Sequence, residues 1–490
     1  MIDRAHPMGL VAPLALILGA ASGTAALAAM AAQSGNRAIL AVGLVFCLGI
    51  AAVLLRNALA VLIFALAVAL SYNRQFYSFD DWLGDYGSFG LFWTLADGLM
   101  VVIMLVALAR AAVTGQGSAS GPRGLSIEVP QVPLVLLVAA MALSALHTET
   151  LPPALFETMR VAKFLLYFLV LRAIMDRDLA RVLMVAIGVM IVLQCALGVM
   201  QVARGAGGSG LGSLEAQTGE MAYRATGTTG HPNMYAPFLL MPTLGFVALG
   251  LAGRAGVHRL ALLAGAAGAL AIMLSQSRAP VAAMLAGLAC LAVAHLARGV
   301  VRPQRVLGAA VVLTTLGFLA VLPLASRIME RLAGDLGGSV EFRASYNDAA
   351  IGIWRLDPVL GVGPAHFMTE LPAFHPDYAR INDDIQVGRK IANVRAIAPV
   401  HNVYLWILAE IGLVGLTCFL LFLGATGWLF HQAARGADPG NRFFVGVFWG
   451  FAGLCAVQVT DFSLWWDHQL MMLTLLLALA VQVRRQGGVP

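Results

Sequence analysis

The stretch His401-Asn402-Val403-Tyr404-Leu405-Trp406-Ile407-Leu408-Ala409-Glu410-Ile411-Gly412-Leu413-Val414-Gly415-Leu416 joins the most polar region of the chain to an apolar run that continues to residue 430. A run of this length can span a bilayer as a helix, which needs about 20 residues. His401 stands at its polar start, and histidine is the side chain whose charge changes nearest to neutral pH. The stretch therefore predicts a membrane helix with a titratable group at its mouth.

The whole chain has the composition of a membrane protein. Of its 490 residues, 60% are hydrophobic and 11% are charged, against about 25% charged in soluble domains. The mean hydropathy is +0.84. Only Lys163 and Lys390 of the 31 basic residues are lysine, and the arginines punctuate apolar runs. This pattern excludes a nucleic-acid partner, which needs a solvated basic face.

Apolar runs separated by charged or turn residues predict about fourteen helices, so the expected fold class is all-α. The first run is too long for the apolar core of a signal peptide, about 7 to 15 residues, and is expected to be a transmembrane helix. The five cysteines stand singly in such runs, without the paired spacing of a zinc or redox site. The runs are 8–32, 38–55, 58–72, 88–109, 130–147, 157–173, 179–203, 235–253, 258–275, 279–297, 305–325, 401–430, 443–461 and 464–483.

Arginines fall in every second connection between these runs, as the positive-inside rule predicts if both termini are cytoplasmic. The intervening connections then face outward: 73–87, 148–156, 204–234, 275–279, 326–400 and 462–464. Four regions follow: N-terminal transmembrane helices in 1–203, central helices with arginine-bearing outer loops in 204–325, a mainly helical outer loop subdomain in 326–400, and C-terminal helices in 401–490.

Apart from the single Arg74 in 73–87, arginines stand against this rule in three of the outward segments. Arg224 lies in 204–234, Arg278 in the tight turn 275–279, and Arg343 in the long outer loop. Such arginines indicate a negatively charged ligand, most clearly at Arg278, because long loops translocate regardless of charge. The alternative is that they pair with acidic residues of the long loop or with lipid headgroups.

Two local patterns would build a site around these arginines. The Thr-Gly-Thr-Thr-Gly sequence at 226–230 predicts a turn with free amide donors, and Pro232-Asn233 suits the start of the next helix, so that Arg224 and this turn would cradle a phosphate. Residues 343–354 predict an amphipathic helix with Tyr346, Ala350, Ile353 and Trp354 on one face. This helix is either a surface helix or the wall of a cleft with Arg343 pointing inward.

Charged residues inside apolar runs are expected to find partners. Glu410 should hold the helix bundle together through a polar contact, and Asp97 should bond within the bundle. Arg160 and Lys163 are expected to reach the outer membrane surface.

The order of several arginines, glycines and His401 along the chain resembles that of the bacterial O-antigen ligase and polymerase superfamily of the WaaL and Wzy type. The resemblance covers roughly residues 220–430. It rests on Arg224 with Gly227, Pro232 and Asn233; on Ser277-Arg278; on Arg343 with Trp354, Pro358, Gly361 and Gly363; and on His401-Asn402 followed by Glu410, Gly412, Gly415 and Leu416.

The resemblance implies a GT-C-like, inverting glycosyltransferase with about 12–14 transmembrane helices at the periplasmic face of the bacterial inner membrane, needing neither metal nor cofactor. The donor would be a glycan on undecaprenyl pyrophosphate, and the acceptor a sugar hydroxyl of lipid A-core (a ligase) or of a growing O-antigen or exopolysaccharide chain (a polymerase). It assigns His401 as general base and Arg224, Arg278 and Arg343 to the pyrophosphate. Supporting residues are Asn402, Asn233, Tyr346 and Arg395.

A polysaccharide flippase, or another multi-pass transporter, is the alternative from a different class. Transporters place charged groups near the middle of the membrane, whereas the polar residues here gather at one surface.

Overall fold

The computed structural model describes residues 58–72, 76–78, 91–114, 128–148, 150–205, 223–253, 256–297, 304, 336–375, 400–436 and 438–487. The helices are α3 (Ala58–Ala69), α4 (Leu95–Thr114), α5 (Gln131–Ala145), α6 (Leu151–Ile174), α7 (Arg177–Ala203), α8 (Pro232–Leu251), α9 (Gly256–Leu274), α10 (Arg278–Ala297), α13 (Leu336–Trp354), α14 (Phe367–Phe374), α16 (Val403–Ala433), α17 (Pro439–Val457) and α18 (Asp467–Gly487), with the 3-10 turn η6 (Ser463–Trp465). Two short strands, β1 (Phe76–Ser78) and β2 (Leu91–Trp93), pair in antiparallel fashion.

The all-α membrane fold expected from the apolar runs is confirmed. Each run within the described residues contains a helix, whereas the runs 8–32, 38–55 and 305–325 lie outside them. Among the described residues, six helices are long and apolar enough to cross a membrane: α7, α8, α9, α10, α16 and α17.

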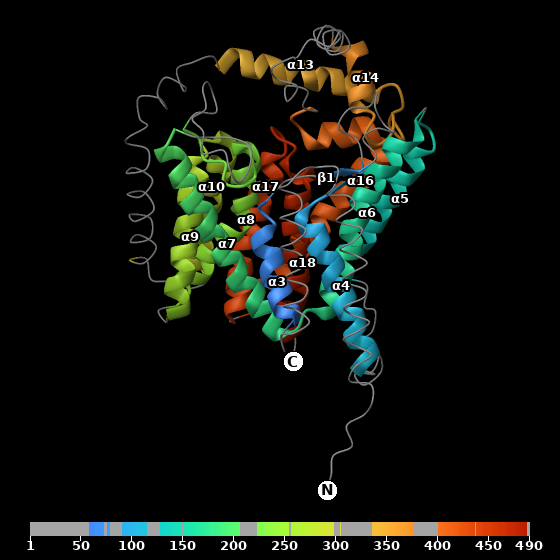
Figure 1. The fold of residues 1–490 in the computed structure, drawn as a ribbon. Coiled ribbons are helices and arrows are strands. Elements are labelled where there is room, and N and C mark those ends of the chain that lie inside the picture. The colour runs from blue at the N-terminus through green and yellow to red at the C-terminus, as the bar shows by residue number, and fades with distance from the viewer. Residues whose placement is uncertain are drawn as a thin grey trace.

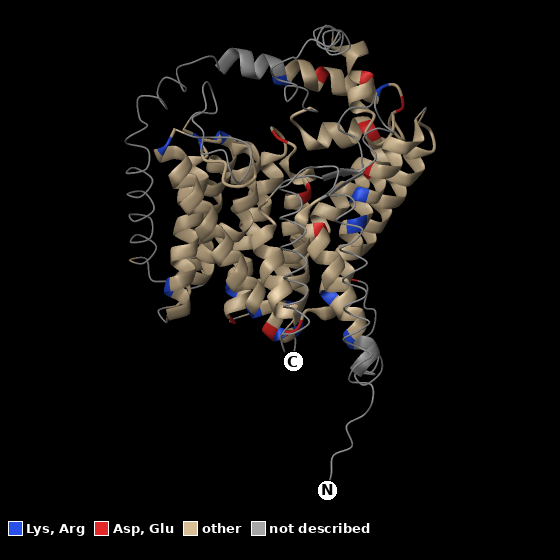
Figure 2. Cartoon of the chain, in the orientation of Figure 1, with Lys and Arg blue, Asp and Glu red and all other residues tan. Residues whose placement is uncertain are grey.

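The long helices stand side by side as a bundle, and α13 lies across one end of it, close to α14 (Figure 1). We call this end the α13 end. Charged residues gather towards the two ends of the bundle, while a mixed group of both signs lies inside it near α6 (Figure 2). The region that carries the predicted site residues is the α13 end.

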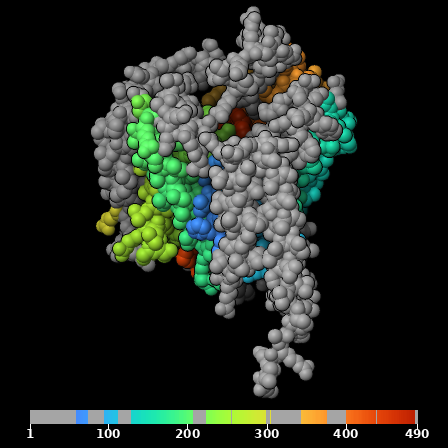
Figure 3. Space-filling model, viewed as in Figure 1, coloured from blue at the N-terminus to red at the C-terminus, as the bar shows by residue number. Residues whose placement is uncertain are grey.

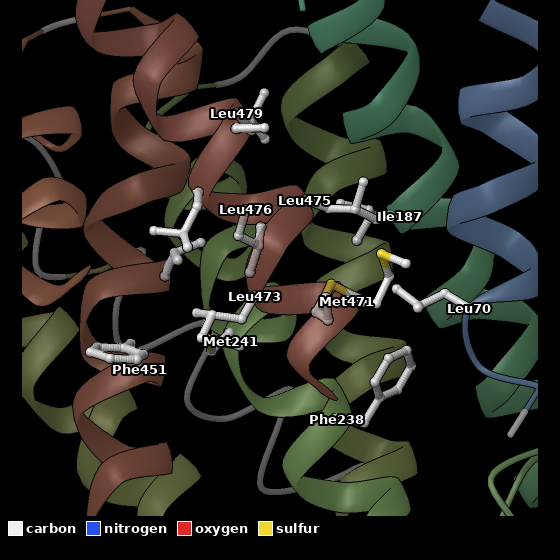
Figure 4. Packing of buried hydrophobic residues seen from close by; sticks show 14 of the residues in the cluster. Leu70, Ile187, Phe238, Met241, Phe451, Met471, Leu473, Leu475, Leu476 and Leu479 are labelled. Carbon is white, nitrogen blue, oxygen red and sulfur yellow. The ribbon is translucent and has the colours of Figure 1, made fainter. Parts of the chain in front are cut away.

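The core centres on α8 and α18, which are buried around most of their circumference. α8 has no polar face, as expected for a membrane helix surrounded by others. α17 approaches α8 closely because Gly446 and Gly450 face it; a Cβ on Gly446 would lie 1.9 Å from the Leu244 carbonyl oxygen. Figure 4 shows side chains of α18 packed among those of its neighbours, with Leu70, Ile187, Phe238, Met241, Phe451, Met471, Leu473, Leu475, Leu476 and Leu479 labelled.

A buried network of ion pairs joins α4, α6 and α18. Arg160 Nη1 donates to Asp467 Oδ1 (2.7 Å), and Lys163 Nζ donates to Asp467 Oδ2 (2.5 Å) and Asp97 Oδ2 (3.1 Å). Glu157 pairs with Arg160 as well. The expectation for Asp97 is confirmed, whereas that for the two cations was wrong. Carboxylates brought from three helices give them partners inside the bundle, so they need not reach the surface.

We expect Asp467→Asn to lower the free energy of unfolding by about 3–5 kcal/mol, because it leaves two buried cations without their shared carboxylate. Denaturant or thermal unfolding of the purified protein in detergent measures this change. Asp178→Asn is the matched control: Asp178 pairs with Arg181 on the surface, where its side chain is 87% exposed, and its loss should have little effect. Equal stabilities of the two variants would contradict the role given to the network.

Candidate active site

Arg224 and Arg278 are brought to one turn at the α13 end. The segment around Arg224 lies against the α9–α10 turn: Arg224 Nε donates to the Ser275 carbonyl (3.0 Å), and Ala225 N donates to the Leu274 carbonyl (2.9 Å). Arg224 is buried, whereas Arg278 is exposed as the first residue of α10. One arginine therefore supports the turn and the other stands at its surface.

Asn233 joins the N-termini of two helices beside these arginines. It is the second residue of α8, and its Oδ1 accepts from Ser277 Oγ (2.9 Å), directly before α10, and from Arg224 Nη2 (3.4 Å). The positive ends of both helix dipoles thus lie close together. Two guanidinium groups and two helix N-termini form an arrangement suited to an anion.

The turn 226–230 differs from its prediction. The amides of Thr226 and Gly227 donate to Gln201 Oε1 (3.0 and 2.8 Å), and that of Thr228 donates to Gln194 Oε1 (3.0 Å). These donors are therefore not free for a phosphate, because two glutamines of α7 already use them. Gly227 is required there: its φ is +51°, and a Cβ would lie 2.0 Å from Gln194 Oε1.

His401 is held at the start of α16 by its neighbours in the chain. Asn402 caps the helix, its Oδ1 accepting from the amides of Tyr404 (3.0 Å) and Leu405 (3.2 Å). The His401 ring lies 5.3 Å from that of Phe462, between centroids. Through these contacts Asn402 fixes the residue at which α16 begins. It thereby also fixes the position of His401, which directly precedes Asn402.

Two titratable groups at this point share the influence of Arg343. Burial, and then the positive charge of Arg343, lower the pKa of His401 to about 4. Burial raises the pKa of Asp461 to about 7, although its bond from Phe462 N (2.7 Å) and the charge of Arg343 favour the carboxylate. His401 is therefore neutral at pH 7 and able to accept a proton, whereas Asp461 titrates near neutral pH.

The sequence analysis missed Asp461. This residue ends the run 443–461, directly before the short outward connection 462–464, and the Val403 amide donates to its carbonyl (3.2 Å). The signal that could have found it is a carboxylate at the end of an apolar run, on the side of the membrane predicted for His401.

Arg343 is half-buried on α13, and the residues predicted to share a face of that helix do so. Tyr346 and Ile353 are buried in a cluster that includes Ala409 of α16, and the Tyr346 ring lies 4.8 Å from that of His375. Trp354 is only partly buried. Tyr346 thus supports α13 from inside its core, and Arg395 lies outside the described residues.

The predicted residues fall into two groups at one end of the molecule: contacts join Arg224 with Asn233 and the turn before Arg278, and the charge of Arg343 acts on His401. The corner from α17 to α18 lies between them. Phe462 of this corner contacts His401, η6 packs on α8, and the His468 ring lies 5.5 Å from that of Phe238 in α8. The space-filling view shows a hollow at this end, where green and red segments are visible beneath α13 (Figure 3).

A small cavity lies elsewhere, beside the buried ion pairs, where Thr94, Asp97, Asp467 and His468 line it. None of the predicted site residues lines this cavity, and we take the two groups of residues at the α13 end as the candidate site. Within the described part of the chain, no three His, Cys, Asp or Glu side chains gather as metal ligands would.

The comparison with protein families covers part of this region. Residues 262–420 match a family model described as O-antigen ligase. The match runs from α9 into α16 and thus includes Arg278, Arg343 and His401. No curated protein matches the chain. Over residues 262–420 this match confirms the resemblance to the O-antigen ligase and polymerase superfamily that the sequence showed.

Proposed function

We propose that the protein transfers a glycan from undecaprenyl pyrophosphate to a sugar hydroxyl, that the α13 end is the site of transfer, and that this end faces the periplasm from the bacterial inner membrane. One observation carries the proposal: a neutral histidine lies within electrostatic reach of Arg343 at the end of the bundle where Arg224 and Arg278 meet two helix N-termini. The family match supports a ligase or polymerase of glycans.

In the proposed reaction, the acceptor hydroxyl oxygen attacks the anomeric carbon of the donor while His401 accepts the hydroxyl proton. The bond from that carbon to the pyrophosphate oxygen breaks, and undecaprenyl pyrophosphate leaves with the electron pair. Attack from the face opposite the leaving group inverts the anomeric configuration. Guanidinium groups of Arg224, Arg278 and Arg343 would stabilise the negative charge that develops on the leaving group.

The low pKa of His401 fits a base that strengthens when the donor binds. Because it is buried and lies near Arg343, the imidazole is a weak base with a low pKa. A bound pyrophosphate would offset the positive charge of Arg343 and raise the pKa of His401 towards its ordinary value. A base whose pKa approaches the working pH is more effective in proton transfer.

A reconstitution in proteoliposomes tests the proposal and separates its two forms. Lipid-linked donor is supplied first alone and then with lipid A-core, in buffer containing EDTA because we expect transfer to need no divalent metal. A ladder of longer glycans from donor alone identifies a polymerase, and product formed only after addition of lipid A-core identifies a ligase. Absence of any transferred glycan with both substrates, with and without magnesium, would overturn the proposal.

A further inference from the structure

Helix α16 is broken at Gly412, where φ is 65° and ψ is −167°. Residues 358–363, which follow α13 and which we call the inserted segment, pass through the break. Four backbone hydrogen bonds join them to α16: Leu413 N to Pro358 O (3.0 Å), Val414 N to Val359 O (3.2 Å), Val362 N to Ala409 O (3.1 Å) and Gly363 N to Glu410 O (2.8 Å). Backbone groups that a continuous helix would pair internally are therefore paired with a distant segment of the chain.

Only glycine fits at the closest approach of the two segments. Gly361 has a φ of +73°, and a Cβ there would lie 2.4 Å from the Glu410 carbonyl carbon. A Cβ on Gly412 would lie 2.2 Å from the Val359 carbonyl oxygen, and its φ is also positive. Both backbone conformations are ones that other residues rarely adopt.

Glu410 connects the broken part of α16 to α14 and α5. Its Oε1 accepts from the amide of Phe367 (3.1 Å), the first residue of α14, and its carbonyl oxygen accepts from Ser144 Oγ (3.1 Å) of α5. The side chain is buried. It therefore holds the start of α14, just beyond the inserted segment, against α16.

The consequence is a closed frame around the candidate base. α13 carries Arg343 and leads into the inserted segment, while the first part of α16 runs from His401 to the break. Buried contacts close the other side of the frame, since Tyr346 and Ile353 of α13 share a cluster with Val400, the residue before His401. A local backbone distortion of this kind persists only where the surrounding structure enforces it, and it commonly marks a functional constraint.

We propose that Glu410, Gly361 and Gly412 are positioning residues for the transfer: by keeping the inserted segment in the break of α16, they fix Arg343 relative to His401. The inference rests on the proposed function, but the relation between Arg343 and His401 is measurable without any turnover.

The test compares Glu410→Ala, Glu410→Gln and Gly361→Ala with Gly424→Ala as the matched control. Gly424 lies in the same helix α16, and a Cβ there would meet nothing within 4 Å. Glu410→Gln keeps an oxygen that can accept from the Phe367 amide. The primary measurement is the titration of His401, followed by NMR on histidine-labelled protein in detergent and assigned by the signal that His401→Ala removes.

The charged group whose influence on His401 the structure identifies is Arg343 of α13, and the same arginine acts on Asp461. Loosening the frame moves Arg343 away and admits water, and both changes favour the imidazolium. We expect the pKa of His401 to rise from about 4 towards 6.5 in Glu410→Ala and Gly361→Ala. It should stay near 4 in Glu410→Gln and Gly424→Ala.

In the transfer assay, the same two variants should lose about 100-fold in kcat, since a misplacement of about 1 Å can have this effect. The KM for donor should change less than kcat, because only Arg343 moves, whereas Arg224 and Arg278 stand on other elements. A merely structural role would lower the yield of folded protein without moving the His401 titration.

An unchanged His401 titration in folded Glu410→Ala or Gly361→Ala would overturn the inference, and so would a Glu410→Gln variant that behaves like Glu410→Ala. Should Glu410→Ala and Gly361→Ala fail to fold, Glu410→Met takes their place, because it fills the buried position but removes the oxygen that accepts from the Phe367 amide; a raised His401 pKa then supports the inference and an unchanged one overturns it. If the titration shifts as expected but no protein transfers glycan, wild type included, the positioning holds and the proposed function fails.

Discussion

Replacing His401 by alanine is expected to lower kcat for glycan transfer by about 100 to 10,000-fold, the usual contribution of a positioned base. The variant should fold and retain donor binding, because the described contacts of the imidazole are to one aromatic ring and its Nδ1 atom has no hydrogen-bond partner among the described residues. The measurement is transfer of a radiolabelled glycan in proteoliposomes. His431→Ala is the matched control, since His431 is also half-buried but lies near the opposite end of α16.

The dependence on pH follows from the low pKa of His401. The neutral imidazole is the active form, so the protein without substrate should keep its competence down to about pH 5, and kcat/KM should fall only as pH approaches 4. The acid limb of kcat should lie at higher pH, because the bound pyrophosphate raises the pKa of His401 in the complex. Coincident limbs would contradict the interaction between donor and base.

The transporter alternative predicts a different outcome for the same variant. If His401→Ala transferred glycan at the wild-type rate but failed to move lipid-linked donor across the bilayer, the assignment as a glycosyltransferase would be wrong. Measuring translocation with a fluorescent donor in the same vesicles separates the two functions.

The sequence predicted the helices because each apolar run long enough to span a bilayer has few ways to satisfy its backbone except as a helix. It also singled out His401 and the arginines from their charge and position. The break at Gly412 could not be foreseen in this way: it depends on hydrogen bonds from residues 358–363 to 409–414, which no local pattern encodes. The sequence contains the glycines of both segments, but it does not predict the close approach of the two backbones that requires them.

Pairing between distant helices was equally hidden from the sequence. From the sequence, Arg160 and Lys163 were predicted to reach the membrane surface. In the structure, Asp97 of α4 and Asp467 of α18 pair with them inside the bundle. Likewise, the amides of the turn 226–230 were predicted to be free, whereas glutamines of α7 accept hydrogen bonds from them. In both cases the local pattern was interpreted without the partner that tertiary packing brings.

Replacing Arg278 by alanine is expected to lower kcat/KM by about 100 to 1,000-fold, the effect of removing one preorganised group that stabilises charge in a transition state. Arg278 is exposed at the start of α10, so its loss should leave stability nearly unchanged. Arg259→Ala is the matched control: Arg259 is also exposed but lies near the start of α9, at the far end of the α9–α10 hairpin. Rates from a short, water-soluble pyrophosphate donor analogue measure the effect.

Arg224→Ala should combine a similar kinetic loss with a loss of stability, and this difference separates the two arginines. Arg224 is buried and donates to the Ser275 carbonyl, which its removal leaves without that donor, at a typical cost of about 1–3 kcal/mol. Inorganic pyrophosphate should inhibit the wild-type protein and inhibit Arg278→Ala more weakly. If Arg278→Ala and Arg259→Ala transferred glycan equally well and bound pyrophosphate alike, the α9–α10 turn would not be the pyrophosphate site, and the anion would have to be held by Arg343 alone.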